Sequence, residues 1–215
     1  IMISINHVII SSFSTSIGYI VFRKLNGRIL LNKIIPTIIF LNELIFIFYL
    51  IYTDKFRIQQ HLPLEMCYIN NILIMISLSK NFFHPYFHFS SIFCGLCGIL
   101  CHNLVSYDPI IYSHFVVSHV ILVLYFVFSY QSYLNLTKKE FKISIYYTTI
   151  LLLIVFFINK LLGSNYWFMF YKPDGPNLTI IFPEWPFYFI VLLALGFLTY
   201  LTVFIVNKNK SRKIV

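Results

Sequence analysis

One cysteine and one histidine in this sequence form the combination that nucleophilic catalysis needs. Cys67 follows the segment Leu62-Pro63-Leu64-Glu65-Met66, and His119 follows Ser118. A thiolate is the reactive form of cysteine, and a neighbouring imidazole can take the thiol proton. Cys67 and His119 are therefore candidate catalytic residues. Their structural alternatives are a small core residue for Cys67 and an interhelical hydrogen bond for His119.

Other polar residues could complete such a site. Asn165 could orient the imidazole or donate to an oxyanion, and Tyr166, which follows it, could help to hold a substrate. His7 is a further candidate in the first apolar segment. Glu65 lies two residues before Cys67, so on a helix these two side chains would point to nearly opposite sides.

Glu43 lies in the middle of a long apolar segment, where an unpaired carboxylate is strongly disfavoured. It is either a proton carrier or site acid, or a neutral carboxyl group that is hydrogen-bonded to another helix. By depth, His119 is its nearest expected partner, although roughly one to two helical turns nearer the outer face. We expect Glu43 to face the bundle interior, within hydrogen-bond reach of a polar side chain or water.

Three cysteines and one histidine could be interpreted as a metal site: Cys94, Cys97, Cys101 and His102. The three cysteines have i, i+3, i+7 spacing and would share one face of a helix. Gly95 and Gly98 interleave with these cysteines, and close packing of membrane helices uses small residues. The pattern therefore favours packing, and we expect no metal and no other cofactor.

The composition indicates that these residues lie in a membrane. Hydrophobic residues make up 59% of the 215 residues and charged residues 11%, whereas soluble domains contain about 25% charged residues. Such a chain cannot cover its own surface with polar groups, so lipid must contact it. The net charge of +9 comes from basic residues near helix ends, which suit anionic lipid head groups better than nucleic acid.

Seven apolar segments approach the roughly 20 residues that a transmembrane helix needs: 5–22, 34–52, 64–79, 88–106, 113–130, 143–161 and 186–206. We therefore predict an all-α bundle of seven transmembrane helices in one domain over residues 1–215. On this model all but four of the 16 Lys and Arg residues fall on one side, the exceptions being Lys55, Arg57, Lys160 and Lys172. Because basic residues mark the cytoplasmic side, we expect the N-terminus outside and the C-terminus in the cytoplasm.

This orientation places three distant candidates at a similar depth. Cys67 enters the third helix near the outer face, His119 lies about two turns into the fifth, and Asn165 follows the sixth. We therefore expect Cys67, His119 and Asn165 to line one cavity in the outer half of the bundle.

The chain also resembles a known family, the bacterial YwaF-like integral membrane proteins, whose eukaryotic relatives include transmembrane protein 164. The motifs that carry the resemblance run along nearly the whole chain: His7, Glu43, Leu62-Pro63-Leu64-Glu65-Met66-Cys67, Gly95-Leu96-Cys97-Gly98, Asp108-Pro109, Ser118-His119, Asn165-Tyr166-Trp167-Phe168-Met169, Lys172-Pro173 and Trp185-Pro186-Phe187-Tyr188. Three departures stand out. Glu65 replaces a histidine, Asp108-Pro109 inverts a Pro-Asp turn, and Phe187 replaces a tryptophan.

The resemblance implies a lipid acyltransferase in a bacterial cell membrane, with membrane phospholipids as substrates. Cys67 would carry the acyl chain as a thioester, and His119 would activate first the thiol and then the incoming hydroxyl group. An outer site would lack acyl-CoA, so transfer between lipids fits better. Two alternatives stay open: a small-molecule or ion transporter that uses Glu43 and His119, and a non-catalytic subunit of unknown partners. The transporter lacks support from an inverted repeat or from paired broken helices.

Overall fold

The computed structural model describes residues 5–25, 30–80, 84–100, 108–132, 136–173 and 178–212, and these residues form helices and connections without strands. This confirms the predicted all-α class. The α-helices are α1 (Ile5–Phe22), α3 (Ile35–Tyr52), α4 (Ile58–His61), α5 (Met66–Ser79), α6 (Pro85–Leu100), α7 (Pro109–Ser132), α8 (Lys138–Leu162) and α9 (Phe187–Arg212). A π-helical turn, η1 (Leu30–Ile34), precedes α3, and two 3-10 turns, η2 (Tyr166–Phe168) and η3 (Leu178–Ile181), lie between α8 and α9.

Five of these helices, α1, α3, α7, α8 and α9, are long and apolar enough to cross a membrane. The chain is therefore a multi-pass membrane protein. The apolar helices α5 and α6 are shorter, at 14 and 16 residues, and span about 21 and 24 Å at 1.5 Å per residue. A bilayer core is about 30 Å thick, so the count of seven spans stays a prediction.

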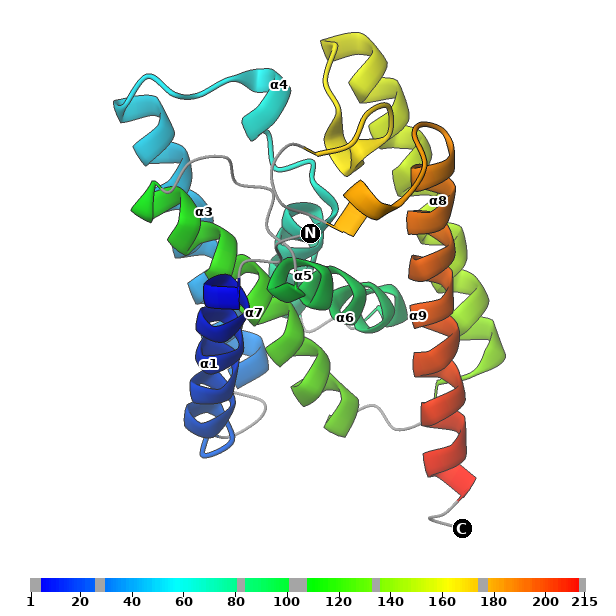
Figure 1. Cartoon of the computed structure of the whole chain (residues 1–215). Coiled ribbons are helices and arrows are strands. Elements are labelled where there is room, and N and C mark those ends of the chain that lie inside the picture. The colour runs from blue at the N-terminus through cyan, green and yellow to red at the C-terminus, as the bar shows by residue number, and fades with distance from the viewer. Residues whose placement is uncertain are drawn as a thin grey trace.

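Helix α7 is the centre of the bundle. In its most apolar segment 61% of the residues are buried, against 11% in the corresponding segments of α1, α8 and α9. Figure 1 shows α1 and α3 on one side of α7, α8 and α9 on the other, and α6 across the middle. Side chains on α7 are thus shielded from lipid by the surrounding helices, which suits a polar site.

Local sequence signals explain where α8 begins and ends. Thr137 and Glu140 form a capping box in which each side chain accepts a hydrogen bond from the other's backbone amide. The helix therefore starts at Lys138 rather than at the predicted residue 143. At its other end Gly163 adopts φ 63°, a conformation that glycine reaches without strain.

Candidate active site

Cys67 is the second residue of α5, and a proline sets the point where this helix begins. Pro63 disfavours a helical conformation of the residue before it, and Leu62 is extended with ψ 144°. This ends the short helix α4 and allows α5 to start again at Met66. The Cys67 side chain is half-buried and lies at the N-terminal end of α5, facing α7.

The structure brings Cys67 and His119 into direct contact. The Cys67 Sγ lies 3.0 Å from the His119 Nε2. The other ring nitrogen, Nδ1, lies 2.7 Å from the carbonyl oxygen of Phe115, and a carbonyl can only accept. Nδ1 therefore carries the proton of the neutral ring, which leaves Nε2 to accept the hydrogen of the thiol. This is the arrangement that a general base requires.

The His119 ring rests on the bare backbone of α6. A methyl group at Gly98 would lie 1.8 Å from the His119 Cδ2 and 2.4 Å from its Nε2, far inside van der Waals contact. At Gly95 it would lie 2.5 Å from Val123 and 3.2 Å from the carbonyl oxygen of His119. The two glycines thus allow α6 to approach α7 closely, as small residues do in membrane helices.

His7 reaches this arrangement through Gly98. Its Nε2 lies 2.7 Å from the carbonyl oxygen of Gly98 and therefore donates to it. Its Nδ1 is left to accept from the Tyr112 hydroxyl at 3.1 Å. His7 is buried and holds the backbone segment against which the His119 ring packs, so its place is that of a supporting residue.

Glu43 faces the interior, but its neighbour is His114 rather than the expected His119. The Glu43 Oε2 lies 3.3 Å from the His114 Nε2, and both side chains are buried. The reason is the register of the antiparallel helices α3 and α7. Asn42 donates to Ser118 at 2.9 Å, so the next residues of α3 lie closer to the N-terminal end of α7.

Two polar residues of this region, Asn42 and His114, escaped the sequence-based prediction. A signal was present, because Ser113-His114 repeats the pair Ser118-His119 five residues earlier on the same helix. Asn71 also supports this part of α7, since its amide donates to the carbonyl oxygen of Ser118 at 3.3 Å. Amides of α3 and α5 thus hold the helical turn that carries His119.

Neither Cys94 nor Cys97 belongs to a group of possible metal ligands in the described part of the chain. Cys94 is buried and its Sγ accepts a hydrogen bond from Asn70 at 3.2 Å, whereas Cys97 is exposed. Within the described ranges no three His, Cys, Asp or Glu side chains are grouped as metal ligands. Cys101 and His102 lie outside the residues that the structure describes.

Comparison with known proteins settles the relationship of the chain. The model of the TMEM164 family matches residues 1–204. The chain belongs to the TMEM164 family. No curated protein and no solved structure matches it. The expected relationship with transmembrane protein 164 is therefore confirmed.

The departure of this TMEM164-family chain at Glu65 has a structural role. The Glu65 Oε2 accepts the backbone amide of Trp167 at 3.0 Å, and the Trp167 indole donates to the carbonyl oxygen of Leu64 at 2.8 Å. Tyr166 adds two bonds, because its hydroxyl donates to the Ile58 carbonyl at 2.6 Å and accepts from the Leu62 amide at 3.1 Å. These bonds dock the connection after α8 onto the start of α5.

Asn165 belongs to the same connection, and its side chain bonds within that connection rather than to Cys67 and His119, the two residues of the candidate catalytic dyad. Its Oδ1 accepts the backbone amide of Phe170 at 2.9 Å, and its Nδ2 donates to the carbonyl oxygen of Tyr171 at 2.7 Å. The side chain therefore closes its own loop. The structure thus joins Cys67 and His119 but places Asn165 in the supporting loop.

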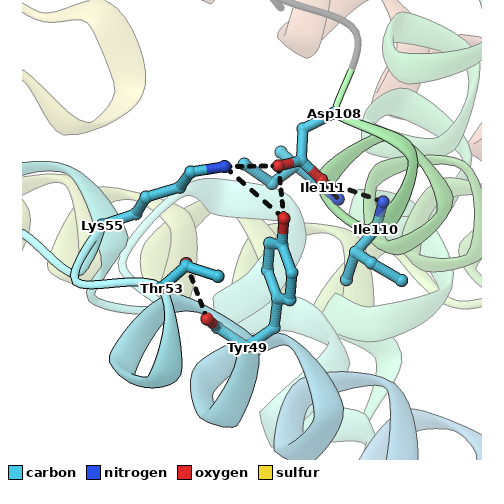
Figure 2. A network of polar contacts seen from close by, with 6 residues as sticks. All are labelled: Tyr49, Thr53, Lys55, Asp108, Ile110 and Ile111. Carbon is cyan, nitrogen blue, oxygen red and sulfur yellow. Dashed lines mark hydrogen bonds and ion pairs between the residues drawn. The ribbon is translucent and has the colours of Figure 1, made fainter.

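The inverted pair Asp108-Pro109 forms the start of α7. The Asp108 Oδ1 accepts the amides of Ile110 and Ile111, at 3.0 and 3.3 Å, and Pro109 suits the first helical position because its missing N–H needs no partner there. The Asp108 Oδ2 accepts hydrogen bonds from Lys55 and Tyr49, both at 2.6 Å (Figure 2). The bond with Lys55, followed by that with Tyr49, lowers the pKa of Asp108 to about 2.

Proposed function

We propose that this chain is a cysteine-dependent lipid acyltransferase that moves an acyl chain between lipids of the membrane. The observation that carries the proposal is the 3.0 Å contact of the Cys67 Sγ with the His119 Nε2, together with the Phe115 carbonyl that fixes the imidazole tautomer. Family membership supports it, since the resemblance to transmembrane protein 164 implies such an activity.

In the first step, His119 accepts the Cys67 proton at Nε2 while Sγ attacks the ester carbonyl carbon of a donor phospholipid. The tetrahedral intermediate collapses with cleavage of the carbon–oxygen bond. The leaving alkoxide takes the proton from Nε2, which yields a lysophospholipid and a thioester on Cys67. A half-buried thiolate would be costly alone, so proton transfer to the adjacent imidazole is needed as the nucleophile attacks.

In the second step, a hydroxyl group of the acceptor lipid gives its proton to the His119 Nε2 and attacks the thioester carbonyl. Cleavage of the carbon–sulfur bond releases the acylated acceptor. The Cys67 sulfur recovers its proton from Nε2, so the dyad returns to its starting state. Both steps need only the two lipids, the Cys67 thiol and the His119 imidazole.

The first turn of α5 offers donors for the oxyanion of the tetrahedral intermediate. Glu65 precedes this helix but its side chain does not cap it. In the described part of the chain the amides of Cys67 and Tyr68 have no acceptor. Such amides carry partial positive charge and favour a developing oxyanion near the attacking sulfur. They take the role that the sequence suggested for Asn165.

We infer a topology of seven spans, in which α5 and α6 are short, with the N-terminus outside and the C-terminus in the cytoplasm of a bacterial cell. In Figure 1 the connections after α3 and α8 lie at one end of the bundle, and the ends of α1 and α9 at the other, which supports alternation. On the proposed outer side, the positive charges of Lys55 and Lys172 are neutralised by ion pairs with Asp108 and Glu184, at 2.6 and 2.7 Å.

The topology can be tested by labelling single cysteines in a variant that lacks the native ones. A cysteine in place of Lys138 should react only after the membrane is permeabilised, whereas one in place of Lys172 should react in intact cells. Reaction of both from the same side would contradict the seven-span model.

Thioester formation provides the test of the proposed activity. The purified chain in phospholipid vesicles with labelled acyl chains should acquire label that hydroxylamine releases, and a lysophospholipid should discharge it. Cys67→Ala and His119→Gln should abolish the labelling, while the exposed Cys97→Ala serves as the matched control and should keep it. Full labelling of Cys67→Ala would refute the proposal.

A transporter is the second candidate, and the buried pair of Glu43 and His114 is the observation that favours it. An intramembrane carboxylate beside an imidazole is typical of proton pathways. Cys67→Ala separates the two functions, because transport through Glu43 would not need the thiol. If Cys67→Ala restores the function of cells that lack the protein as well as the wild type does, transport is the better conclusion.

A further inference from the structure

The pair of Glu43 and His114 leaves three buried polar atoms unsatisfied. The Glu43 Oε1 and both ring nitrogens of His114 have no hydrogen-bond partner in the part of the chain that the structure describes. The 3.3 Å contact between the two side chains lacks hydrogen-bond geometry. Glu43 is only 9% exposed and His114 only 3%. Since buried polar groups are nearly always paired, these atoms indicate a missing partner.

Aromatic rings hold the His114 imidazole in place of hydrogen bonds. The Phe46 ring stacks on it with centroids 3.8 Å apart and an angle of 5° between the planes. The Tyr68 ring lies 4.8 Å away at 40°. Ring packing therefore fixes the imidazole, while no described residue bonds to either of its nitrogens, as expected of a site for a small polar group.

This pair adjoins the Cys67–His119 dyad on its outer side. Tyr68 directly follows Cys67, and its ring centroid lies 6.5 Å from that of His119. Along α7, His114 precedes His119 by five residues, or about 7.5 Å toward the outer end of the helix. In a phospholipid the head group likewise lies outward of the ester bonds.

We propose that Glu43 and His114 bind the head group of the substrate phospholipid and select one that carries hydroxyl groups. This inference rests on the proposed function and names the substrate class of the same site. A neutral imidazole offers one donor and one acceptor, and the Glu43 Oε1 offers a further acceptor. A hydroxyl group both donates and accepts, so a glycerol head group satisfies all three atoms. An ammonium group only donates and leaves the imidazole N–H unpaired.

A proton relay explains the same pair less well. A relay needs a continuous chain of hydrogen bonds to the dyad. Both ring nitrogens of His114 lack such a bond among the described residues, whereas the His119 nitrogens are occupied by Phe115 and Cys67. The hydrogen bonds therefore stop between the two histidines, and a bound group remains the better explanation.

The test measures lipid binding without chemistry, so that it stands apart from the acyltransferase proposal. The full chain with Cys67→Ala is purified in a neutral detergent and titrated with two short-chain anionic lipids, phosphatidylglycerol and phosphatidylpropanol. They have the same charge and similar size, but only the first has head-group hydroxyls. Binding is read from the rise in melting temperature. We expect phosphatidylglycerol to bind about tenfold more tightly, as one or two additional hydrogen bonds would give.

Two variants test whether His114 causes the preference for phosphatidylglycerol. His114→Phe keeps the stacking on Phe46 but removes both nitrogens, and added to Cys67→Ala it should make the two lipids bind equally. His88→Phe, a buried histidine of α6 that lies against Ser129, is the matched control and should keep the preference. Equal binding in the parent protein, or a preference that survives His114→Phe, would overturn the head-group site. Short-chain phosphatidylethanolamine is titrated as a third lipid, and its preferred binding would overturn the hydroxyl assignment. Failure of thioester formation with the preference intact would instead refute only the acyltransferase.

Discussion

The glycine beneath the His119 imidazole is the position at which a small substitution should most directly disturb the Cys67–His119 contact. In Gly98→Ala the new methyl carbon would lie 1.8 Å from the His119 Cδ2 and 2.4 Å from the Nε2, whereas carbon atoms in contact need about 3.5 Å. The ring must therefore retreat by about 1.7 Å. Because Nδ1 is bound to the Phe115 carbonyl at 2.7 Å, such a shift breaks either that bond or the contact with Cys67.

The expected loss follows from this displacement. A misplacement of about 1 Å in a catalytic group costs about a hundredfold in rate, which corresponds to about 2.7 kcal/mol of transition-state stabilisation. Overpacking itself costs about 1–3 kcal/mol, and the higher helix propensity of alanine returns up to about 1 kcal/mol. Gly98→Ala should therefore fold with a modestly lower melting temperature but lose about a hundredfold in thioester formation.

Alkylation of Cys67 by N-ethylmaleimide measures the dyad without a lipid substrate. Gly98→Ala should slow this reaction about tenfold, as His119→Gln also should, because the thiol loses its base. Gly196→Ala is the matched control, since the nearest atoms to its methyl group would be those of the Phe93 ring, at an ordinary contact distance of 3.6 Å. It should leave alkylation and stability unchanged. Wild-type alkylation and turnover in Gly98→Ala would refute the proposed seat for His119.

Three further predictions concern the parts that support the site. Lys55 is the chief cause that lowers the pKa of Asp108 to about 2 in the folded protein. The stability that ionised Asp108 gives to the folded protein is therefore complete above its unfolded pKa of about 3.9 and is lost as the pH falls toward 2. The difference in melting temperature between wild type and Asp108→Asn should therefore persist at pH 6 and vanish in that window. Glu65→Gln can still accept the Trp167 amide and should melt like the wild type, whereas Glu65→Ala should lose about 1 kcal/mol in denaturant unfolding; equal stabilities would contradict this role. Tyr166→Phe leaves a carbonyl and an amide unpaired and should cost about 1–2 kcal/mol, and an unchanged denaturation midpoint would show the docking contact to be dispensable.

Much of the helical framework could be predicted from patterns along the chain. Each of the seven predicted apolar segments overlaps one of the observed helices, because hydrophobic runs and helix ends are local properties. The expectation that Cys67 and His119 share a similar depth came from the same pattern, since depth depends on the count of residues from each helix end. The interleaved Gly95 and Gly98 also indicated a close helix contact before its partner was known.

Which side chains meet at a given depth depends on helix rotation and register, and these come from packing across the bundle. Glu43 meets His114 rather than His119 because α3 and α7 run antiparallel in a register held by Asn42 and Ser118. Asn165 has the residue type of an oxyanion donor, yet its backbone neighbours occupy its amide.

The sequence by itself determined that this chain is an apolar, helical membrane protein, and it singled out one thiol and one imidazole as candidate partners. The tertiary structure decided that Cys67 lies 3.0 Å from His119, that the imidazole rests on Gly98, and that Glu43 and His114 form a separate polar pair. The apolar character of each segment is a local property, so it can be predicted from the residues of that segment alone. Contacts between segments that lie 52 residues apart, as in the dyad, depend on how all helices share one core.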